Sequence, residues 1–335
     1  MSQPRVLVLG AGGWGTALAM VLERNGARVR LWGHDAAYAD EIATTRRNPK
    51  FLPGVTLPAA IDVSGALTRS DGPWDIILSI VPTQFLRSAL ASLEIDDRQA
   101  TLVVSGSKGI ERGSLELPSE ILRTRFPRAC LVALSGPSHA EEVARGLPAS
   151  LVAASRQVDD ARRAADALNS SAFRVYTSQD MIGVELGGAV KNIIAIAAGI
   201  ADGLGLGDNT RAALITRGAH ELARLGKALG ARRETFSGLA GIGDLIATCT
   251  SPHSRNRAVG LRIGGGETLE VILRSSEKVP EGVDTTRSLV DLAGQRGLDL
   301  PITEQVHAIL FQAKAPREAV QSLMSRATKD EFEGA

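Results

Sequence analysis

The sequence lacks several patterns that would place it in a specialised class of protein. Its 335 residues include only two cysteines, Cys130 and Cys249, which are too few for a disulfide framework and suit a reducing compartment. The five histidines are scattered, and no His/Cys group has zinc-site spacing. Lys and Arg number 38 against 37 Asp and Glu, so the net charge is +1 and offers no basic excess for nucleic acid. We therefore expect a cytoplasmic protein with no metal and no nucleic-acid partner.

Long apolar runs are also scarce. The uncharged stretch from Val6 to Leu22 superficially resembles a signal peptide, but its four glycines would break an apolar helix there. The apolar stretch that begins near residue 183 is interrupted by Lys191 and Asn192. Because a membrane helix needs about 18 uninterrupted apolar residues, we expect no integral membrane segment.

The first half of the chain alternates strand-like and helical runs, which predicts a mostly parallel sheet with helices on both faces. Strands are expected at 5–10, 27–33, 75–81, 100–105, 130–136, 150–155 and 173–178. From about residue 180 the pattern is helical, at 181–204, 210–230, 268–274, 284–296 and 303–313. The fold class is therefore α/β plus all-α, with an α/β domain over 1–179 and a helical domain over 180–335.

The first strand leads directly into Gly10-x-Gly12-x-x-Gly15 at the start of a helix. Gly10 permits a tight turn, Gly12 lets the backbone approach a pyrophosphate, and Gly15 allows close packing of helix on strand. The helix N-terminus offers unpaired N–H groups and the positive end of its dipole to phosphates. This spacing predicts a dinucleotide site, and the alternative is a glycine-rich turn without a ligand.

The end of the second strand leaves the choice between NAD and NADP open. An acidic residue is expected there, about 20 residues after the glycines, to bind the ribose 2′-OH of NAD. The sequence has His34 followed by Asp35. Asp35 could bind the ribose or cap the next helix, and His34 with Arg30 could tolerate a 2′-phosphate.

Two further loops follow predicted strands. Lys108 lies in the loop 105–113 at the carboxyl edge of the sheet, where doubly wound folds bind ligands, and the alternative is an exposed surface lysine. Ser138 stands before a predicted helix, which it could cap with Glu141 as the partner in a capping box. The same hydroxyl and the neighbouring amides could instead bind a small anion.

The loop 238–260 concentrates polar groups in the helical half. Gly241 and Gly243 permit unusual backbone angles directly before Asp244. Four polar residues come together further on: Ser254, Arg255, Asn256 and Arg257. Because arginine binds phosphate through paired hydrogen bonds, the pattern favours a phosphate site over a merely capped helix start.

Taken together, these motifs resemble the bacterial-type NAD(P)-dependent glycerol-3-phosphate dehydrogenases. The matching stretches fall in order from residue 10 to residue 286: "GAGGWGTALA", "NPKFLPGVTLP", "SKGIE", "SGPSHAEEV", "ELGGAVKNIIAIAAGI", "GLAGIGDLIATCTSPHSRNRAVG" and "KVPEGVDT". Gly13 departs from the family pattern, where serine is common, and so does His139, where an aromatic residue is common. The resemblance implies a Rossmann domain before a helical domain, an active site between them, and reduction of dihydroxyacetone phosphate to sn-glycerol 3-phosphate for phospholipid synthesis.

The resemblance also implies roles for individual residues. It makes Lys191 the catalytic acid/base. It implies substrate contacts for Lys108, Gly136, Ser138, Lys191, Asp244, Ser254, Arg255 and Asn256. The NAD or NADP contacts are the motif glycines Gly10, Gly12 and Gly15 together with Gly13, Trp14, His34, Lys108, Ala140, Arg255, Val279 and Glu281. It is compatible with a homodimer.

This role would explain why a lysine interrupts an apolar helix. A lysine ammonium is costly to bury unless it is paired, and Asp244 could keep Lys191 charged. Hydride attack on a ketone leaves an alkoxide, which a cationic donor stabilises and protonates. The alternative is a structural lysine whose stem packs in the core while its head reaches water.

Three other hypotheses compete with this interpretation, and one of them is a structural protein built on an inactive dehydrogenase, which an activity assay would distinguish. A β-hydroxyacid-type dehydrogenase shares the two-domain plan, but its pattern has an Asn four residues after the Lys. In this chain the residue four positions after Lys191 is Ala195, and Asn192 is instead adjacent to the lysine. A non-catalytic nucleotide-sensing protein would account for the Rossmann half but not for Lys191 or the Ser254–Arg257 cluster.

Overall fold

The chain folds into two compact units, described by a computed structural model over residues 3–275, 280–328 and 330–331. The sheet unit comprises 1–107 and 117–181, and the helical unit comprises 108–116 and 182–335. The sequence suggested two continuous domains, 1–179 and 180–335. The segment 108–116 instead groups with the helices, although it directly follows sheet residues, so both units are discontinuous.

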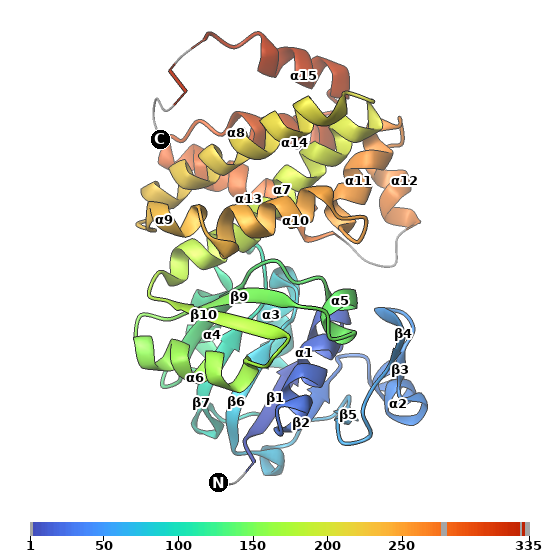
Figure 1. Cartoon of the computed structure of the whole chain (residues 1–335), viewed down its shortest axis with the longest axis vertical. Coiled ribbons are helices and arrows are strands. Elements are labelled where there is room, and N and C mark those ends of the chain that lie inside the picture. Colours follow the sequence, from blue (N-terminus) through green and yellow to red (C-terminus); the bar gives the residue numbers. More distant parts are fainter. Residues whose placement is uncertain (1–2, 276–279, 329, 332–335) are drawn as a thin grey trace. The chain divides into compact units, whose positions relative to one another are not determined.

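One 8-stranded sheet organises the sheet unit, in the order β10-β9-β8-β7-β6-β1-β2-β5 (Figure 1). Its strands are β1 (Arg5–Leu9), β2 (Arg28–Trp32), β5 (Asp62–Ser64), β6 (Trp74–Ser79), β7 (Ala100–Ser105), β8 (Cys130–Ser135), β9 (Ala149–Ala154) and β10 (Phe173–Ser178). Neighbours pair in parallel except β8 and β9, which are antiparallel. The predicted mostly parallel sheet is confirmed, and β5 is the strand of this sheet that the sequence did not reveal.

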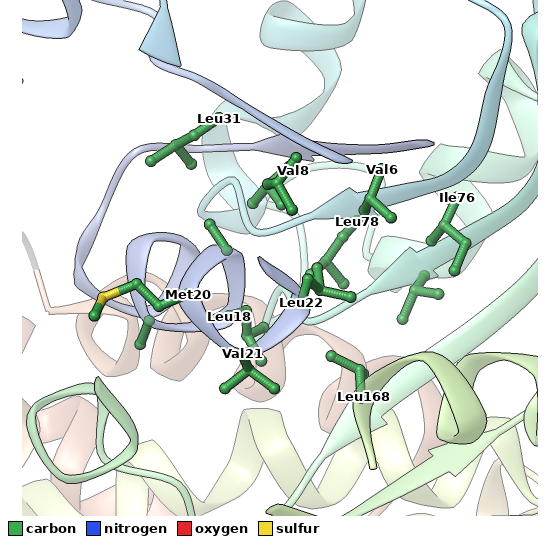
Figure 2. Packing of buried hydrophobic residues seen from close by; sticks show 14 of the residues in the cluster. Val6, Val8, Leu18, Met20, Val21, Leu22, Leu31, Ile76, Leu78 and Leu168 are labelled. Carbon is green, nitrogen blue, oxygen red and sulfur yellow. The ribbon is translucent and has the colours of Figure 1, made fainter. Parts of the chain in front are cut away.

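The central strands are buried on both faces, which is why they read as continuous apolar runs. On one face Val6 and Val8 of β1 pack with Leu18 and Leu22 of α1 (Gly13–Arg24), as Figure 2 shows. On the other face the apolar residues of β1 join a second cluster with α3 (Thr83–Ala91) and α4 (Pro118–Arg125). Helices therefore cover both faces of the sheet.

Shorter elements complete the sheet unit. They are α2 (Ala36–Thr45), β3 (Arg47–Asn48), β4 (Leu52–Thr56), η1 (Arg69–Asp71), η2 (Asp97–Gln99), α5 (Ala140–Ala144) and α6 (Val158–Leu168). β3 and β4 form a separate antiparallel hairpin. Its strands were not predicted because β3 has two residues and β4 contains Pro53 and Gly54, which are poor strand formers.

The second unit is helical in its described residues, as predicted. Its elements are α7 (Met181–Gly203), α8 (Gly207–Ala228), α9 (Arg233–Phe236), η3 (Leu239–Gly243), α10 (Asp244–Thr250), α11 (Arg255–Gly264), α12 (Leu269–Arg274), α13 (Glu281–Arg296), α14 (Pro301–Phe311) and α15 (Pro316–Met324). Helix α7 is long and apolar enough to cross a membrane, but 89% of its most apolar window is buried inside the protein. Such burial is typical of a core helix in a soluble protein.

Glycines let α7 and α11 touch backbone to backbone. A Cβ atom added to Gly199 would lie 2.0 Å from the carbonyl oxygen of Arg257, and one added to Gly260 would lie 2.0 Å from that of Ile196. Gly203 and Gly264 make the same kind of contact one turn further on. Because the contacts recur every four residues on both helices, α7 and α11 run in the same direction, and α11 cannot shift without breaking them.

We expect Gly199→Ala to lower the free energy of unfolding by about 1–3 kcal/mol, because the new methyl group must push the backbone of α11 away. The matched control is Gly294→Ala in α13, where an added Cβ meets nothing within 4 Å and alanine favours the helix. Urea unfolding of both variants measures the difference. Equal stability of the two variants would contradict the close α7–α11 contact.

Candidate functional site

Two lysines share one buried carboxylate in the helical unit. Lys191 Nζ from the middle of α7 lies 2.5 Å from Asp244 Oδ1, and Lys108 Nζ lies 3.0 Å from Asp244 Oδ2. Asp244 is 2% exposed and Lys191 is 7% exposed. The Lys108 side chain is also largely buried, so it is not a surface lysine. The site therefore holds two positive groups against one negative group.

Burial and mutual charge shift the pKa values of all three groups. Burial lowers the pKa of Lys191 to about 8, and the positive charge of Lys108 adds to this effect while Asp244 opposes it. Burial also disfavours the charge of Lys108, but its contacts with Asp244 outweigh burial and raise its pKa. Burial opposes the Asp244 carboxylate as well, yet both ammonium groups together lower its pKa. Lys191 is thus the group in this trio that can exchange a proton near neutral pH.

Close backbone packing places Asp244 against α7. A Cβ atom on Gly187 of α7 would lie 2.0 Å from the carbonyl oxygen of Ala240 in η3. Gly241 has a non-helical backbone (φ −100°, ψ −105°) at the kink that precedes α10. Asp244 is the first residue of α10, and Thr248 donates to its backbone carbonyl at 2.6 Å. The unusual backbone predicted before Asp244 is therefore confirmed for Gly241, whereas it is wrong for Gly243, which has ordinary helical angles (φ −61°, ψ −52°).

The turn before α11 presents one uncommitted arginine. Ser254 caps α11 by accepting from Arg257 N at 3.2 Å. Arg257 is held by Asp202 of α7, through Nε at 2.9 Å and Nη2 at 2.6 Å. Arg255 is exposed and makes no hydrogen bond or ion pair with any residue in the described part of the chain. The predicted four-residue cluster is therefore divided: Arg257 holds α7 and α11 together, and Arg255 makes no such ion pair with a described residue.

Asn192 and Asn256 connect three helices. Asn256 Nδ2 donates to Asn192 Oδ1 at 2.9 Å, and Asn256 Oδ1 accepts from Gly282 N at 3.0 Å. Helix α13 has Pro280 at its N-cap, which cannot cap it with a side-chain oxygen, so Asn256 satisfies this N–H instead. Glu281, the first residue of α13, has a pKa raised by burial despite the nearby charges of Arg255 and the two lysines.

The glycine motif lies where the sequence predicted, between β1 and α1 in the sheet unit. Gly10 has φ +114°, which favours glycine, and a Cβ on Gly15 would lie 1.9 Å from the Gly10 carbonyl oxygen. A Cβ on Gly13 would lie 2.6 Å from the carbonyl oxygen of Phe51, so a serine there would require the backbone to move. At Gly12, the N-cap of α1, an added Cβ meets nothing within 4 Å, and no side chain caps the helix. This open helix N-terminus fits the pyrophosphate of a dinucleotide.

At the end of β2 lie the three residues on which the choice between NAD and NADP was predicted to depend. Asp35 is the N-cap of α2 and accepts from Tyr38 N at 3.1 Å, which confirms the hypothesis that it caps this helix. Arg30 was a candidate for a 2′-phosphate, but it pairs with Asp62 at 2.7 Å and with Asp71. Two carboxylates therefore already hold this guanidinium, and the tolerance of Arg30 and His34 for a 2′-phosphate stays a prediction. His34 is exposed directly after β2.

The loop after β8 corrects another detail. Gly136 has φ +143°, and a Cβ there would lie 2.9 Å from Leu151 Cα, so the residue must be small. Ser138 Oγ donates to the Gly136 carbonyl at 3.0 Å, and the N-cap of α5 is His139 rather than Ser138. The expected capping box is wrong because the hydroxyl turns back toward its own loop. Ala140 is the first residue of α5.

The remaining predicted residues divide between the units. Trp14 lies on α1 in the sheet unit with the motif glycines, His34, Gly136, Ser138 and Ala140. Lys108, Lys191, Asp244, Ser254, Arg255, Asn256 and Glu281 belong to the helical unit. Val279 lies outside the described residues. Among the described residues, no three His, Cys, Asp or Glu side chains group as metal ligands. Asp202 could not be found from the sequence, because its role depends on Arg211 and Arg257 in two other helices.

Comparisons with known proteins agree on one family. Family models described as the N-terminus and the C-terminus of NAD-dependent glycerol-3-phosphate dehydrogenase match residues 5–161 and 180–321. The glycerol-3-phosphate dehydrogenase [NAD(P)+] of Geobacillus kaustophilus is 50% identical over 98% of this chain and 96% of its own length. The crystal structure of the Coxiella burnetii glycerol-3-phosphate dehydrogenase is 40% identical with a TM-score of 0.92, covering 97% of this chain and 99% of that one. The Saccharomyces cerevisiae glycerol-3-phosphate dehydrogenase is 26% identical with a TM-score of 0.82, covering 97% and 100% of the two chains.

We expect Gly12→Val to abolish dinucleotide binding while the fold survives. The valine meets no protein atom, and φ −72° with ψ 178° suits a β-branched residue, but its methyl groups fill the open helix N-terminus. NADH fluorescence titration measures binding, and thermal unfolding checks the fold. Gly15→Val is the contrasting variant, because its Cβ collides with Gly10 and should destabilise the sheet unit. A Gly12→Val protein that binds NADH as tightly as the parent would contradict this site.

Proposed function

The chain belongs to the NAD-dependent glycerol-3-phosphate dehydrogenase family, and from this premise we propose which of its residues carry out the reaction. It is an oxidoreductase that reduces dihydroxyacetone phosphate to glycerol 3-phosphate with NAD(P) as coenzyme, an activity within phospholipid metabolism. The observation that carries the proposed roles is the buried trio of Lys191, Asp244 and Lys108.

Lys191 is the proposed acid in ketone reduction. When bound, the reduced nicotinamide supplies the hydride, which adds to the carbonyl carbon of the substrate. The carbonyl oxygen gains the electron pair of the C=O π bond, and Lys191 Nζ gives it a proton, so the product is a secondary alcohol and the lysine becomes neutral. A pKa of about 8 suits this exchange because the lysine is charged at neutral pH yet releases its proton readily. In glycerol 3-phosphate oxidation the neutral amine takes the proton back.

Lys108 keeps Asp244 paired through the cycle. When Lys191 loses its proton, the buried carboxylate would be left without a counter-ion if it had a single partner. Lys108 lies on the other oxygen of the same carboxylate and has a raised pKa, so it stays charged. A carboxylate that is paired in both states spares the reaction the cost of an isolated buried charge.

Arg255 is the proposed anchor for the substrate phosphate. Lys108 and Lys191 are committed to Asp244, and Arg257 is committed to Asp202. Arg255 is the cation of this cluster that makes no hydrogen bond or ion pair with a described residue, although its charge acts on the carboxyl of Glu281, and its fork of N–H groups matches two phosphate oxygens. The N-terminus of α11 adds the favourable end of a helix dipole. Ser254 and Asn256 flank it as further proposed substrate contacts, together with Gly136 and Ser138 of the sheet unit.

The dinucleotide is proposed to bind at Gly10, Gly12, Gly13, Trp14 and Gly15. Supporting this, the N–H groups at the start of α1 lack side-chain caps and the space beside Gly12 is open. His34, Lys108, Ala140, Arg255, Val279 and Glu281 are the further proposed contacts. Because Asp35 is occupied as a helix cap, we propose that the protein accepts both NADH and NADPH.

A cytoplasmic location and a homodimer are the finer proposals. Free cysteines, one half-buried and one buried, support a reducing compartment. The homodimer follows from the family resemblance alone, and sedimentation equilibrium of the purified protein would contradict it by giving the mass of one chain.

We expect Lys191→Met to reduce kcat by on the order of 100- to 10,000-fold, because the variant loses both the proton donor and the charge that faces the alkoxide. Methionine keeps the apolar stem, so the protein should fold and bind NADH as the parent does. Absorbance at 340 nm gives the rate, and Lys227→Met, on the exposed side of α8, is the control. A Lys191→Met protein that retains most of its kcat would overturn the assignment.

The pH profile is the second readout of the same assignment. Reduction needs protonated Lys191, so kcat/KM for dihydroxyacetone phosphate should fall as pH rises above about 8. Oxidation needs the neutral amine, so kcat/KM for glycerol 3-phosphate should rise through the same range. Profiles that move in the same direction for both reactions would show that another group titrates.

We expect Arg255→Lys to raise KM for dihydroxyacetone phosphate about tenfold or more, because an ammonium group cannot reproduce the two parallel hydrogen bonds. Unphosphorylated dihydroxyacetone should be a poor substrate for the parent and should be unaffected by the variant. Steady-state kinetics with both ketones tests this, and Arg274→Lys, an exposed ion-paired arginine of α12, is the control. An equal change for both ketones would mean that Arg255 does not recognise the phosphate.

A further inference from the structure

Asn48 is a fully buried polar side chain beside the glycine motif. It is 0% exposed and lies at the end of β3, in the sheet unit. Its Nδ2 donates to the Ala11 carbonyl at 2.9 Å and to Thr16 Oγ1 at 2.8 Å. Its Oδ1 accepts from Tyr38 OH at 2.7 Å and from Phe51 N at 3.2 Å. Both hydrogens and both lone pairs of the amide are used, so its orientation is fixed.

These bonds join the β3–β4 hairpin to the loop that carries the glycines. Tyr38 of α2 also accepts from Lys50 N at 3.0 Å, and its ring packs edge-on to Phe51 with centroids 5.7 Å apart. The Phe51 carbonyl lies close to Gly13: a Cβ atom added to Gly13 would be 2.6 Å from the Phe51 carbonyl oxygen. The hairpin therefore touches both ends of the motif: Asn48 holds Ala11 and Thr16, and Phe51 covers Gly13.

We propose that Asn48 is a positioning residue for dinucleotide binding, acting through the peptide between Ala11 and Gly12. In a trans peptide the C=O and N–H groups point in opposite directions. By holding the Ala11 carbonyl, Asn48 turns the Gly12 N–H away from itself and fixes its direction. The inference rests on the proposed function, which puts the pyrophosphate at this helix N-terminus.

The Thr16 bond extends this effect into α1. Thr16 is fully buried in the first turns of α1, and Asn48 gives its hydroxyl a partner outside that helix. The loop and the start of the helix are thus tied to one amide, and N–H groups aimed in advance bind phosphate without an ordering cost. The hydrogen bonds of Asn48 involve no charged group, so they should favour the binding of NADH and of NADPH equally.

The test is the dinucleotide affinity of Asn48→Ala. We expect Kd for NADH and for NADPH to rise about tenfold, which corresponds to about 1.4 kcal/mol. Because Asn48 does not touch the reacting atoms, kcat at saturating cofactor and KM for dihydroxyacetone phosphate should stay within about twofold of the parent. Asn48→Asp should lose more affinity than Asn48→Ala, because its charge would face the Ala11 carbonyl and lie near the pyrophosphate.

Tyr38→Phe keeps the proposal falsifiable if Asn48→Ala fails to fold. It removes one hydroxyl that bonds Asn48 and retains the ring, so Kd should rise about threefold. Tyr176→Phe, on an exposed tyrosine of β10, is the matched control and should not change Kd.

The outcomes separate this inference from the proposed function. Folded Asn48→Ala or Tyr38→Phe proteins with unchanged Kd, whatever their melting temperatures, overturn the positioning role. If Gly12→Val loses NADH binding while Asn48→Ala does not, the inference fails and the proposed dinucleotide site stands. If neither variant changes Kd, the glycine loop is not the dinucleotide site.

Discussion

The helical unit depends on one buried carboxylate that compensates two buried ammonium groups. Isolated charges are expensive in a protein interior, and a pair that loses one partner is worse than no pair at all. Asp244 therefore constrains α7, α10 and the segment 108–116 at once, because each contributes one member of the trio. Burial of the trio is the main cause of the lowered pKa of Lys191, and the second positive charge, on Lys108, adds to it while Asp244 opposes it.

Around this trio, side chains of the helical unit mostly pair with one another, and among the described residues the proposed phosphate anchor is without such a pair. Asp202 takes up Arg257 and also Arg211, which joins α8 to the contact between α7 and α11. Asn256 satisfies the start of α13, which its own N-cap cannot. Arg255 differs from its neighbours Arg257 and Lys191 in making no hydrogen bond or ion pair with a described residue, although its charge acts on Glu281. In the sheet unit the start of α1 has no side-chain cap, and the space beside its N-cap Gly12 is open.

The sequence predicted the parts of the structure that depend on local pattern. The strands from β1 to β10 that lie in the buried centre are continuous apolar runs, and α7 and α8 are long enough for their periodicity to be clear. Lys191 could be singled out because it breaks such a pattern. The hairpin β3–β4, the short helices α9 to α11 and the pairing of Arg30 could not be predicted, because they depend on partners distant in the sequence. Asn48 belongs to this group: its four hydrogen bonds reach α1, α2 and its own hairpin.

The discontinuity at residues 108–116 has a consequence for dividing the protein. A gene fragment that begins at residue 182 would encode α7 to α15 with Lys191 and Asp244, but without Lys108. In that fragment the carboxylate would face one ammonium group instead of two, and Lys191 would no longer feel the positive charge that helps to lower its pKa. The complementary fragment would carry Lys108 on a segment with nothing to pack against. The helical unit is therefore a structural unit but not a separable module, since its acid–base chemistry requires nine residues encoded between two strands of the sheet.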